Sequence, residues 1–176
     1  MKRMLPIALG MLALSAGAAF AQQEDIDKAL LALPADNMKA NAMVVKFKAD
    51  ATYDTLKPGT GLVCYDLSGL KGQRAAISVE CTDQGNLKRV AQNVKFAGDQ
   101  AGLDAAEKNG TREKPVFGSV WYHAQGADKD HLRSHTTIAM PGATAQSLGL
   151  SDKPSQTDIW LMGAGTSTAH LMIPGK

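Results

Sequence analysis

Four histidines are the residues of this chain best suited to chemistry, and all lie in its second half: His123, His131, His135 and His170. Imidazole changes its charge near neutral pH and is a common nitrogen ligand for zinc and copper. His135 and His170 each lie in a segment with strand character, so the two side chains meet if these strands are neighbours. We therefore take His135 and His170 as candidate binding residues and candidate metal ligands, with Zn or Cu as the implied cofactor.

Three methionines extend this hypothesis, because thioethers suit Cu(I): Met140, Met162 and Met172. Each observation also has a structural alternative. Methionines in strands commonly fill gaps in a core. His170 stands in an apolar run, where a histidine is more often a core residue that makes one hydrogen bond than a metal ligand. His131 follows several charged residues, so we expect it in solvent.

Catalysis is a further alternative, in which a hydrolase uses His135 or His170 as its general base. Asp130 or Asp158 would orient the imidazole, and a nearby serine or threonine would be the nucleophile. The sequence contains no H-E-x-x-H, G-x-S-x-G, Walker or G-x-G-x-x-G motif. The catalytic residues therefore stay unassigned, and our main expectation is a non-catalytic binding or structural domain.

Residues 1–21 have the pattern of a cleaved Sec-type signal peptide. Lys2 and Arg3 precede an apolar run over residues 5–19, and Ala19-Phe20-Ala21 fits a small-x-small cleavage site. The apolar run is shorter than the about 20 residues that a membrane span requires. We expect export to the periplasm or the extracellular space, with no integral membrane span after cleavage.

The remaining residues, 22–176, have the length of one globular domain. Lys2 and Arg3 are two of the 19 basic residues, so this domain has 17 basic residues against 17 acidic ones. A neutral domain gives no electrostatic reason to expect nucleic acid as a partner. A small molecule or a protein of the cell envelope is the expected partner.

Cys64 and Cys81 are the two cysteines of the chain. An exported protein folds in an oxidising compartment, where an even number of cysteines favours disulfide formation. Both lie in strand-like runs separated by a turn-like stretch, so a hairpin can bring them together. The spacing is much longer than the C-x-x-C of redox-active pairs. We predict a structural disulfide between Cys64 and Cys81.

The hydrophobic pattern predicts an α+β fold, with an antiparallel sheet of about five to seven strands and two or three short helices. The apolar periodicity predicts helices at residues 24–33 and 87–94, with shorter ones near 103–106 and 143–150. Strand character appears at residues 41–48, 52–56, 61–67, 76–81, 116–124, 132–140, 159–162 and 169–173. In the segment 116–124, Phe117, Trp121 and His123 are expected on one face. The two last strands are expected at the centre of the sheet, with His170 in or beside the core.

The C-terminal segment resembles one found in a group of uncharacterised small exported bacterial proteins. These proteins share a tryptophan or tyrosine followed by methionine and glycine, and then A-H-x-M-x-P. They also tend to have a cysteine pair in the first half and a histidine that opens a strand in the middle. The resemblance covers about the last third of the chain and implies export but no activity. The matching residues are Trp160, Met162, Gly165, Ala169, His170, Met172 and Pro174, with Ser134-His135 and the pair Cys64/Cys81 matching more weakly.

Overall fold

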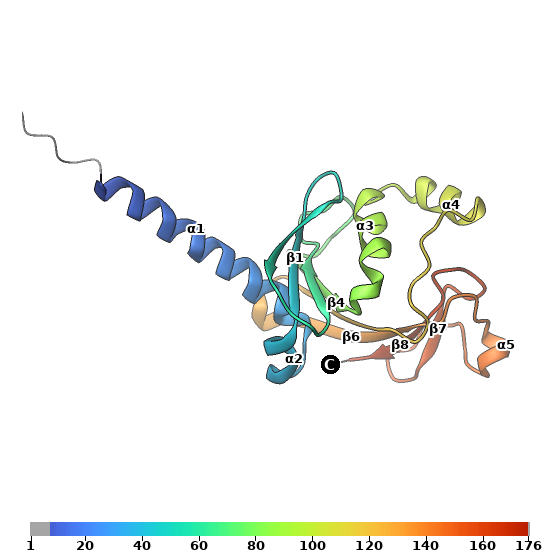
Figure 1. Ribbon diagram of the computed structural model, residues 1–176. Coiled ribbons are helices and arrows are strands. Elements are labelled where there is room, and N and C mark those ends of the chain that lie inside the picture. Colours follow the sequence, from blue (N-terminus) through green and yellow to red (C-terminus); the bar gives the residue numbers. More distant parts are fainter. Residues whose placement is uncertain (1–7, 176) are drawn as a thin grey trace, which may run out of the picture.

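The computed structural model describes residues 8–175 and shows one large twisted sheet with helices on both faces (Figure 1). Lys2 and Arg3, which begin the predicted signal peptide, lie outside the described residues. The strand order is β2-β1-β3-β4-β5-β6-β8-β7. The strands are β1 (Met43–Phe47), β2 (Tyr53–Lys57), β3 (Val63–Asp66), β4 (Ile77–Thr82), β5 (Val120–Gly126), β6 (Leu132–Ala139), β7 (Trp160–Met162) and β8 (His170–Pro174).

The predicted α+β class is confirmed, but the sheet has eight strands in the described residues rather than five to seven. It is also mixed, because β1 and β3 pair in parallel whereas the other neighbours are antiparallel. The chain turns outward from β1 to the edge strand β2 and then crosses back, so β3 runs in the same direction as β1. The crossing passes directly against the backbone of Ala42, where a Cβ atom on Gly59 would lie 2.5 Å from the Ala42 carbonyl carbon. Only glycine fits there.

Five α-helices occupy the described residues, which is more than the two or three predicted. Three of them are substantial, and two are single short turns. A 3-10 turn at Leu30–Ala32 continues the first helix and a second at Gln84–Asn86 leads into the third. The helices are α1 (Ala8–Ala29), α2 (Asp36–Asn41), α3 (Leu87–Lys95), α4 (Gln100–Lys108) and α5 (Ala145–Leu148).

The disulfide between Cys64 and Cys81 is confirmed. The two residues are direct partners of β3 and β4, with Cα atoms 4.0 Å apart, and both are fully buried. Side chains alternate between the two faces of a strand, so both cysteines lie on the face that the end of α1 and the turn at Leu30–Ala32 cover. The disulfide therefore stabilises one apolar layer of the domain.

The opposite face is covered over its first half by α3. Val90 and Val94 of this helix pack on Val45, Tyr65 and their neighbours, and form a second apolar cluster. The amphipathic pattern of residues 87–94 thus predicted the correct packing face. The rest of this sheet face belongs to β5, β6, β8 and β7, beyond the reach of the helix. The uncovered half is where the candidate site lies.

Helix α1 projects from the body of the domain and crosses the predicted cleavage site (Figure 1). Ala19, Phe20 and Ala21 are exposed, whereas contacts with the sheet begin at Gln22, whose amide donates to the Leu56 carbonyl. Further contacts are the ion pair of Lys28 with Asp66 and the burial of Ala29. Within the described residues, no helix is long and apolar enough to cross a membrane.

The C-terminal strands form where the pattern predicted them, but their expected place at the centre of the sheet is wrong. β8 pairs with β6, and β7 is the edge strand. A turn with positive φ at Gly163 and Gly165 connects the two. Burial of Trp160, Leu161 and Ala169 explains the apolar pattern, because packing from above and below can bury an edge strand as well as a central one.

The alternation predicted for residues 116–124 is confirmed with one correction. Trp121 and His123 share a face of β5, but Phe117 lies before the strand and is exposed. Gly118 with positive φ separates it from the strand. On β6, His135 and Thr137 point to the face that carries Trp121 and His123.

Candidate functional site

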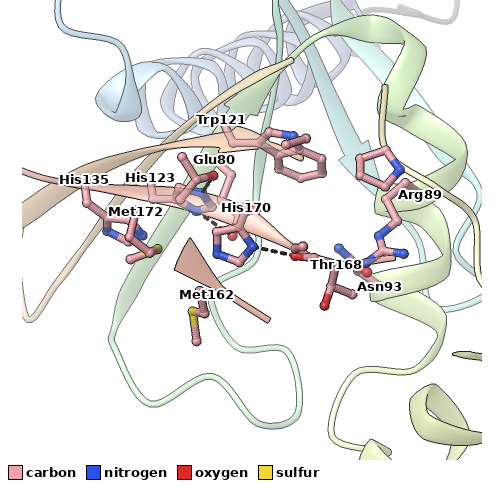
Figure 2. Close-up of a pocket in the computed structure, with 14 residues that line it drawn as sticks. Glu80, Arg89, Asn93, Trp121, His123, His135, Met162, Thr168, His170 and Met172 are labelled. Carbon is pink, nitrogen blue, oxygen red and sulfur yellow. Dashed lines mark hydrogen bonds and ion pairs between the residues drawn. The ribbon is translucent and has the colours of Figure 1, made fainter. Parts of the chain in front are cut away.

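A pocket of about 350 Å³ opens on the uncovered half of the sheet (Figure 2). Its floor is built from alternate residues of the last four strands, and its wall from α3 and the segment before β8. The composition is mixed, with an aromatic ring, thioethers and imidazoles beside a carboxylate and a guanidinium. The residues of the floor are Trp121, His123, His135, Thr137, Met162, His170 and Met172. Glu80 of β4 lies beside them, and Arg89, Asn93 and Thr168 belong to the wall.

A chain of hydrogen bonds crosses the floor from the core into the pocket. The Tyr65 hydroxyl donates to Glu80 Oε2 at 3.0 Å, and Glu80 Oε1 lies 3.1 Å from His123 Nδ1. His123 Nε2 lies 3.3 Å from the hydroxyl of Thr137. In the neutral imidazole, Nδ1 donates to the carboxylate and Nε2 accepts from the threonine. The four side chains come from β3, β4, β5 and β6, so the register of the sheet sets their order.

Glu80 is the carboxylate in this series of hydrogen bonds, and its side chain is mostly buried. Burial raises its pKa, but attraction by His123, the hydrogen bonds from His123 and Tyr65, and attraction by His135 together lower the pKa below the usual value. Glu80 therefore stays ionised at neutral pH and accepts hydrogen bonds at both oxygens. Its negative charge is directed to Tyr65 and His123 rather than to the open part of the pocket.

His135 stacks on His123, with ring centroids 4.5 Å apart and planes nearly parallel. The two residues are direct cross-strand partners of β5 and β6. Burial and then repulsion by His123 lower the pKa of His135 to about 4, against the attraction of Glu80 and with a further lowering by His170. His135 is therefore a neutral ring at pH 7, which offers a flat apolar surface and an unprotonated nitrogen.

His170 is held in one tautomer. Its Nδ1 lies 2.6 Å from the carbonyl oxygen of Thr168, which only accepts hydrogen bonds, so Nδ1 carries the proton and Nε2 has a free lone pair. Burial lowers the pKa of His170; the Thr168 carbonyl raises it, and His123 and Arg89 lower it further, with a net lowering. In Figure 2 the free nitrogen faces away from Thr168, toward the side where Met162 and Met172 lie.

The two methionines are neighbours of His170 on the same sheet face. Met162 is its direct cross-strand partner, and Met172 follows two residues along β8. Met172 in turn pairs with Thr137, which places it diagonally opposite His135. His170 and the two thioethers beside it are donors of the kind that soft metal ions prefer, although no group of three or more His, Cys, Asp or Glu in the described chain is arranged to hold a metal. Met140 does not line the pocket.

The wall formed by α3 carries positive charge. Arg89 is buried, with 6% of its surface exposed, and donates to the Glu113 carbonyl. Burial, and then repulsion by the equally buried Arg112, lower the pKa of Arg89 to about 10, partly offset by Glu107 and Glu113. Arg89 is therefore still a cation at neutral pH.

His135 and His170, the two candidates from the sequence, both line the pocket, on neighbouring strands. They do not lie opposite each other, because His135 pairs with Pro174 and His170 with Ala139. That offset of four residues corresponds to about 13 Å along the strands.

The other candidate partners lie elsewhere. His131 is exposed and bonds Asp128, Asp130 lies in the same exposed turn, and Asp158 accepts from Ser155 and Thr157. The oriented imidazole is His123, bonded to both Glu80 and Thr137. A carboxylate within the apolar run of residues 76–81 was the one sequence signal for Glu80, and Arg89 in the middle of an amphipathic helix gave none.

Comparison of the sequence with protein-family models, with curated proteins and with solved structures finds no match in any of the three. The arguments for function therefore rest on the pocket.

Proposed function

We propose that this chain is an exported, non-catalytic binding domain whose ligand is a small molecule held in the pocket over β5, β6 and β8. One observation carries the proposal: α3 covers half of a sheet face, and the other half forms a hollow lined by Trp121, His135 and His170. Binding sites for small molecules are typically concave and mostly apolar, with a few fixed polar groups. A convex face with both histidines buried would instead have favoured a structural role.

The floor is preorganised for binding. The hydrogen bonds from Tyr65 through Glu80 and His123 to Thr137 fix the ring of His123, and His135 stacks on it. The ring of Trp121 is nearly parallel to that of His123. Three flat rings held in this way offer contact area without the entropic cost of ordering side chains on binding.

The pocket should bind an aromatic molecule of suitable size. We expect the neutral probe N-phenyl-1-naphthylamine to gain fluorescence with residues 22–176 and to saturate at one molecule per chain. In Met162→Trp, a larger side chain beside the pocket should weaken this binding at least about tenfold, which is about 1.4 kcal/mol. A fluorescence titration at constant protein concentration measures both affinities.

Ile159→Trp is the matched control for this experiment. Ile159 and Met162 are equally exposed, at 46%, but Ile159 does not line the pocket. The control should bind the probe as the wild type does. Equal weakening by both substitutions, or no saturable binding by the wild type, would refute a pocket ligand.

Export is the second component of the proposal, and the docking of α1 supports a mature chain that begins at Gln22. Residues 19–21 are exposed, so cleavage after Ala21 removes no contact that they make with the core. We expect the full-length chain, expressed in a bacterium with a Sec system, to yield a periplasmic species whose intact mass begins at Gln22. A cytoplasmic product that retains residues 1–21 would contradict export.

Copper binding is a second candidate function, favoured by the position of His170 beside two thioethers. The hydrogen bond to the Thr168 carbonyl holds the proton on Nδ1 and leaves Nε2 available as a ligand. Backbone carbonyls commonly orient metal-bound histidines in this way. Met162 and Met172 add two soft donors, and His135 lies diagonally from Met172. Thioether and imidazole ligands select Cu(I) over harder ions.

Competition with a chromogenic Cu(I) chelator tests this candidate on untagged protein. Near-stoichiometric Cu(I) is expected, and Met172→Leu should weaken it at least about tenfold, or about 1.4 kcal/mol. Met140→Leu, which changes a methionine outside the pocket, should leave the affinity unchanged. If the wild type removes no Cu(I) from the chelator, this function is excluded.

A further inference from the structure

The α3 wall of the pocket has a buried positive charge that forms no ion pair within the described residues. Arg89 lines the pocket with 6% of its surface exposed, and the hydrogen bond found for it goes to a backbone carbonyl, that of Glu113. In residues 8–175 no carboxylate lies within ion-pair distance of its guanidinium. Buried charges in proteins are as a rule paired, because removing an ion from water costs several kcal/mol that only a partner offsets.

A second arginine lies behind the first. Arg112 is 8% exposed, and it donates to the side-chain oxygens of Gln92 and Asn93, which are neutral groups. It too has no ion pair within the described part of the chain. Arg112 does not line the pocket, but it lies close enough to Arg89 that each guanidinium makes the charge of the other more costly.

The nearest acidic groups are engaged elsewhere. Glu107 accepts from the backbone N–H and the hydroxyl of Ser167, so both of its oxygens are used at the base of the loop before β8. Glu113 is exposed and contributes its backbone carbonyl rather than its carboxylate. At the other side of the pocket, Glu80 holds Tyr65 and His123. Glu107 and Glu113 therefore offset the charge of Arg89 only in part, and neither forms an ion pair with it.

The guanidinium of Arg89 also lies toward the interior of the pocket. Figure 2 shows Arg89 beside Asn93 and Thr168, on the side of the pocket that His170 approaches through its bond to Thr168. Because the oxygen of Asn93 accepts from Arg112, its amide nitrogen is the end available to donate to a ligand. An anion at this wall would receive donors from Arg89 and Asn93, while Trp121 and the methionines contact an apolar body.

We propose that the ligand is a small amphipathic anion, a carboxylate or sulfonate on an aromatic or aliphatic body, whose charged end binds Arg89 and Asn93. This inference rests on the proposed function, since it names the class of molecule that the pocket takes. Arginine is suited to the role because its planar fork matches the two oxygens of a carboxylate. The imidazoles of His135 and His170 are neutral, so Arg89 supplies the positive charge that the ligand would meet.

Two probes with the same aromatic body test the charge directly. One is 1-anilinonaphthalene-8-sulfonate, and the other is N-phenyl-1-naphthylamine, which lacks the sulfonate. We expect residues 22–176 to bind the sulfonate at least about tenfold more tightly, and Arg89→Met to reduce that ratio to near one. Arg89→Lys, which keeps the charge, should preserve part of the preference. Arg74→Met, at an exposed arginine outside the pocket, should leave the ratio unchanged.

The outcomes separate the two proposals. Equal affinity of the wild type for both probes would overturn the anion site while leaving the pocket as a binding site. A preference that persists in Arg89→Met would overturn it as well. Saturable binding of neither probe would remove the proposed function and this inference with it. The wild-type ratio needs no substitution, so it decides the question even if Arg89→Met does not fold.

Discussion

Replacing both cysteines, in Cys64→Ala/Cys81→Ala, should lower the free energy of unfolding by about 3 kcal/mol, as expected for closing a loop of 17 residues. Both sulfurs are fully buried between β3 and β4, under the end of α1. For a domain of this size the loss corresponds to roughly 10 °C in melting temperature. The two residues are changed together because a single substitution leaves a buried free thiol.

The measurement is a urea titration of the double variant beside oxidised and reduced wild type. Reduced wild type is the control, because it loses the crosslink but keeps both side chains; its stability should fall by nearly the same amount. A double variant as stable as the oxidised wild type would contradict the assigned role. The pocket lies on the other face of the sheet, so probe binding below the melting transition should be retained.

Acid should destabilise the domain well above the range in which carboxylates titrate. An unfolded histidine has a pKa of about 6.5, whereas burial and His123 hold that of His135 at about 4 in the folded state. Between pH 6.5 and about 4, His135 therefore binds a proton in the unfolded chain but not in the folded one. Stability is full above pH 6.5 and falls by about 3 kcal/mol by pH 4 through His135, with an additional loss through His170, whose pKa is also lowered.

Glu80 acts in the same direction but at lower pH. Its pKa is lowered in the folded state, so the stability it contributes is present above the unfolded value and is lost as the pH falls through the folded value. The interval from pH 6.5 to 4.5 thus reports mainly on the histidines. In the folded protein, the titratable groups that act on His135 are His123, Glu80 and His170.

Urea midpoints at half-unit steps of pH for wild type and His135→Gln measure this effect. The variant should lose most of the decline between pH 6.5 and 4.5. His131→Gln is the control, because His131 is exposed beside Asp128, and its curve should follow that of the wild type. Parallel curves for wild type and His135→Gln would show that folding does not lower the pKa of His135.

Local pattern predicted much of this fold because the relevant interactions are local. Strand character predicted β6 at residues 132–140, and apolar spacing predicted α3 at residues 87–94. The cysteine pair was predictable because two strands joined by a turn have few ways to pair. In each case the residues that decide the structure are close in sequence.

The errors concern long-range order. Nothing local to β7 and β8 distinguishes an edge from a centre, since Trp160 and Leu161 are buried at the edge. The parallel pairing of β1 with β3 depends on the close passage at Gly59, which is visible only with Ala42 beside it. Phe117 was expected within the strand 116–124, but Gly118 with positive φ separates it from the start of β5.

The candidate site was half predicted for the same reason. His135 and His170 were identified by residue type, but the groups that set their chemistry come from other strands and from α3. Glu80 reaches His123 through the register of β4 with β5, and Arg89 reaches the pocket through the packing of a helix. Such partners follow from tertiary structure, which residue spacing does not contain.

The most direct test of a pocket ligand is a nitrogen–proton NMR spectrum of residues 22–176 recorded during titration with N-phenyl-1-naphthylamine. We expect shifts to concentrate on the Trp121 indole, the His170 ring and the backbone of β5, β6 and β8 around them. Residues of the opposite face, at Cys64 and Cys81, should not move. Shifts concentrated on the disulfide face, or no saturable shifts at all, would contradict the assignment of this pocket as the binding site.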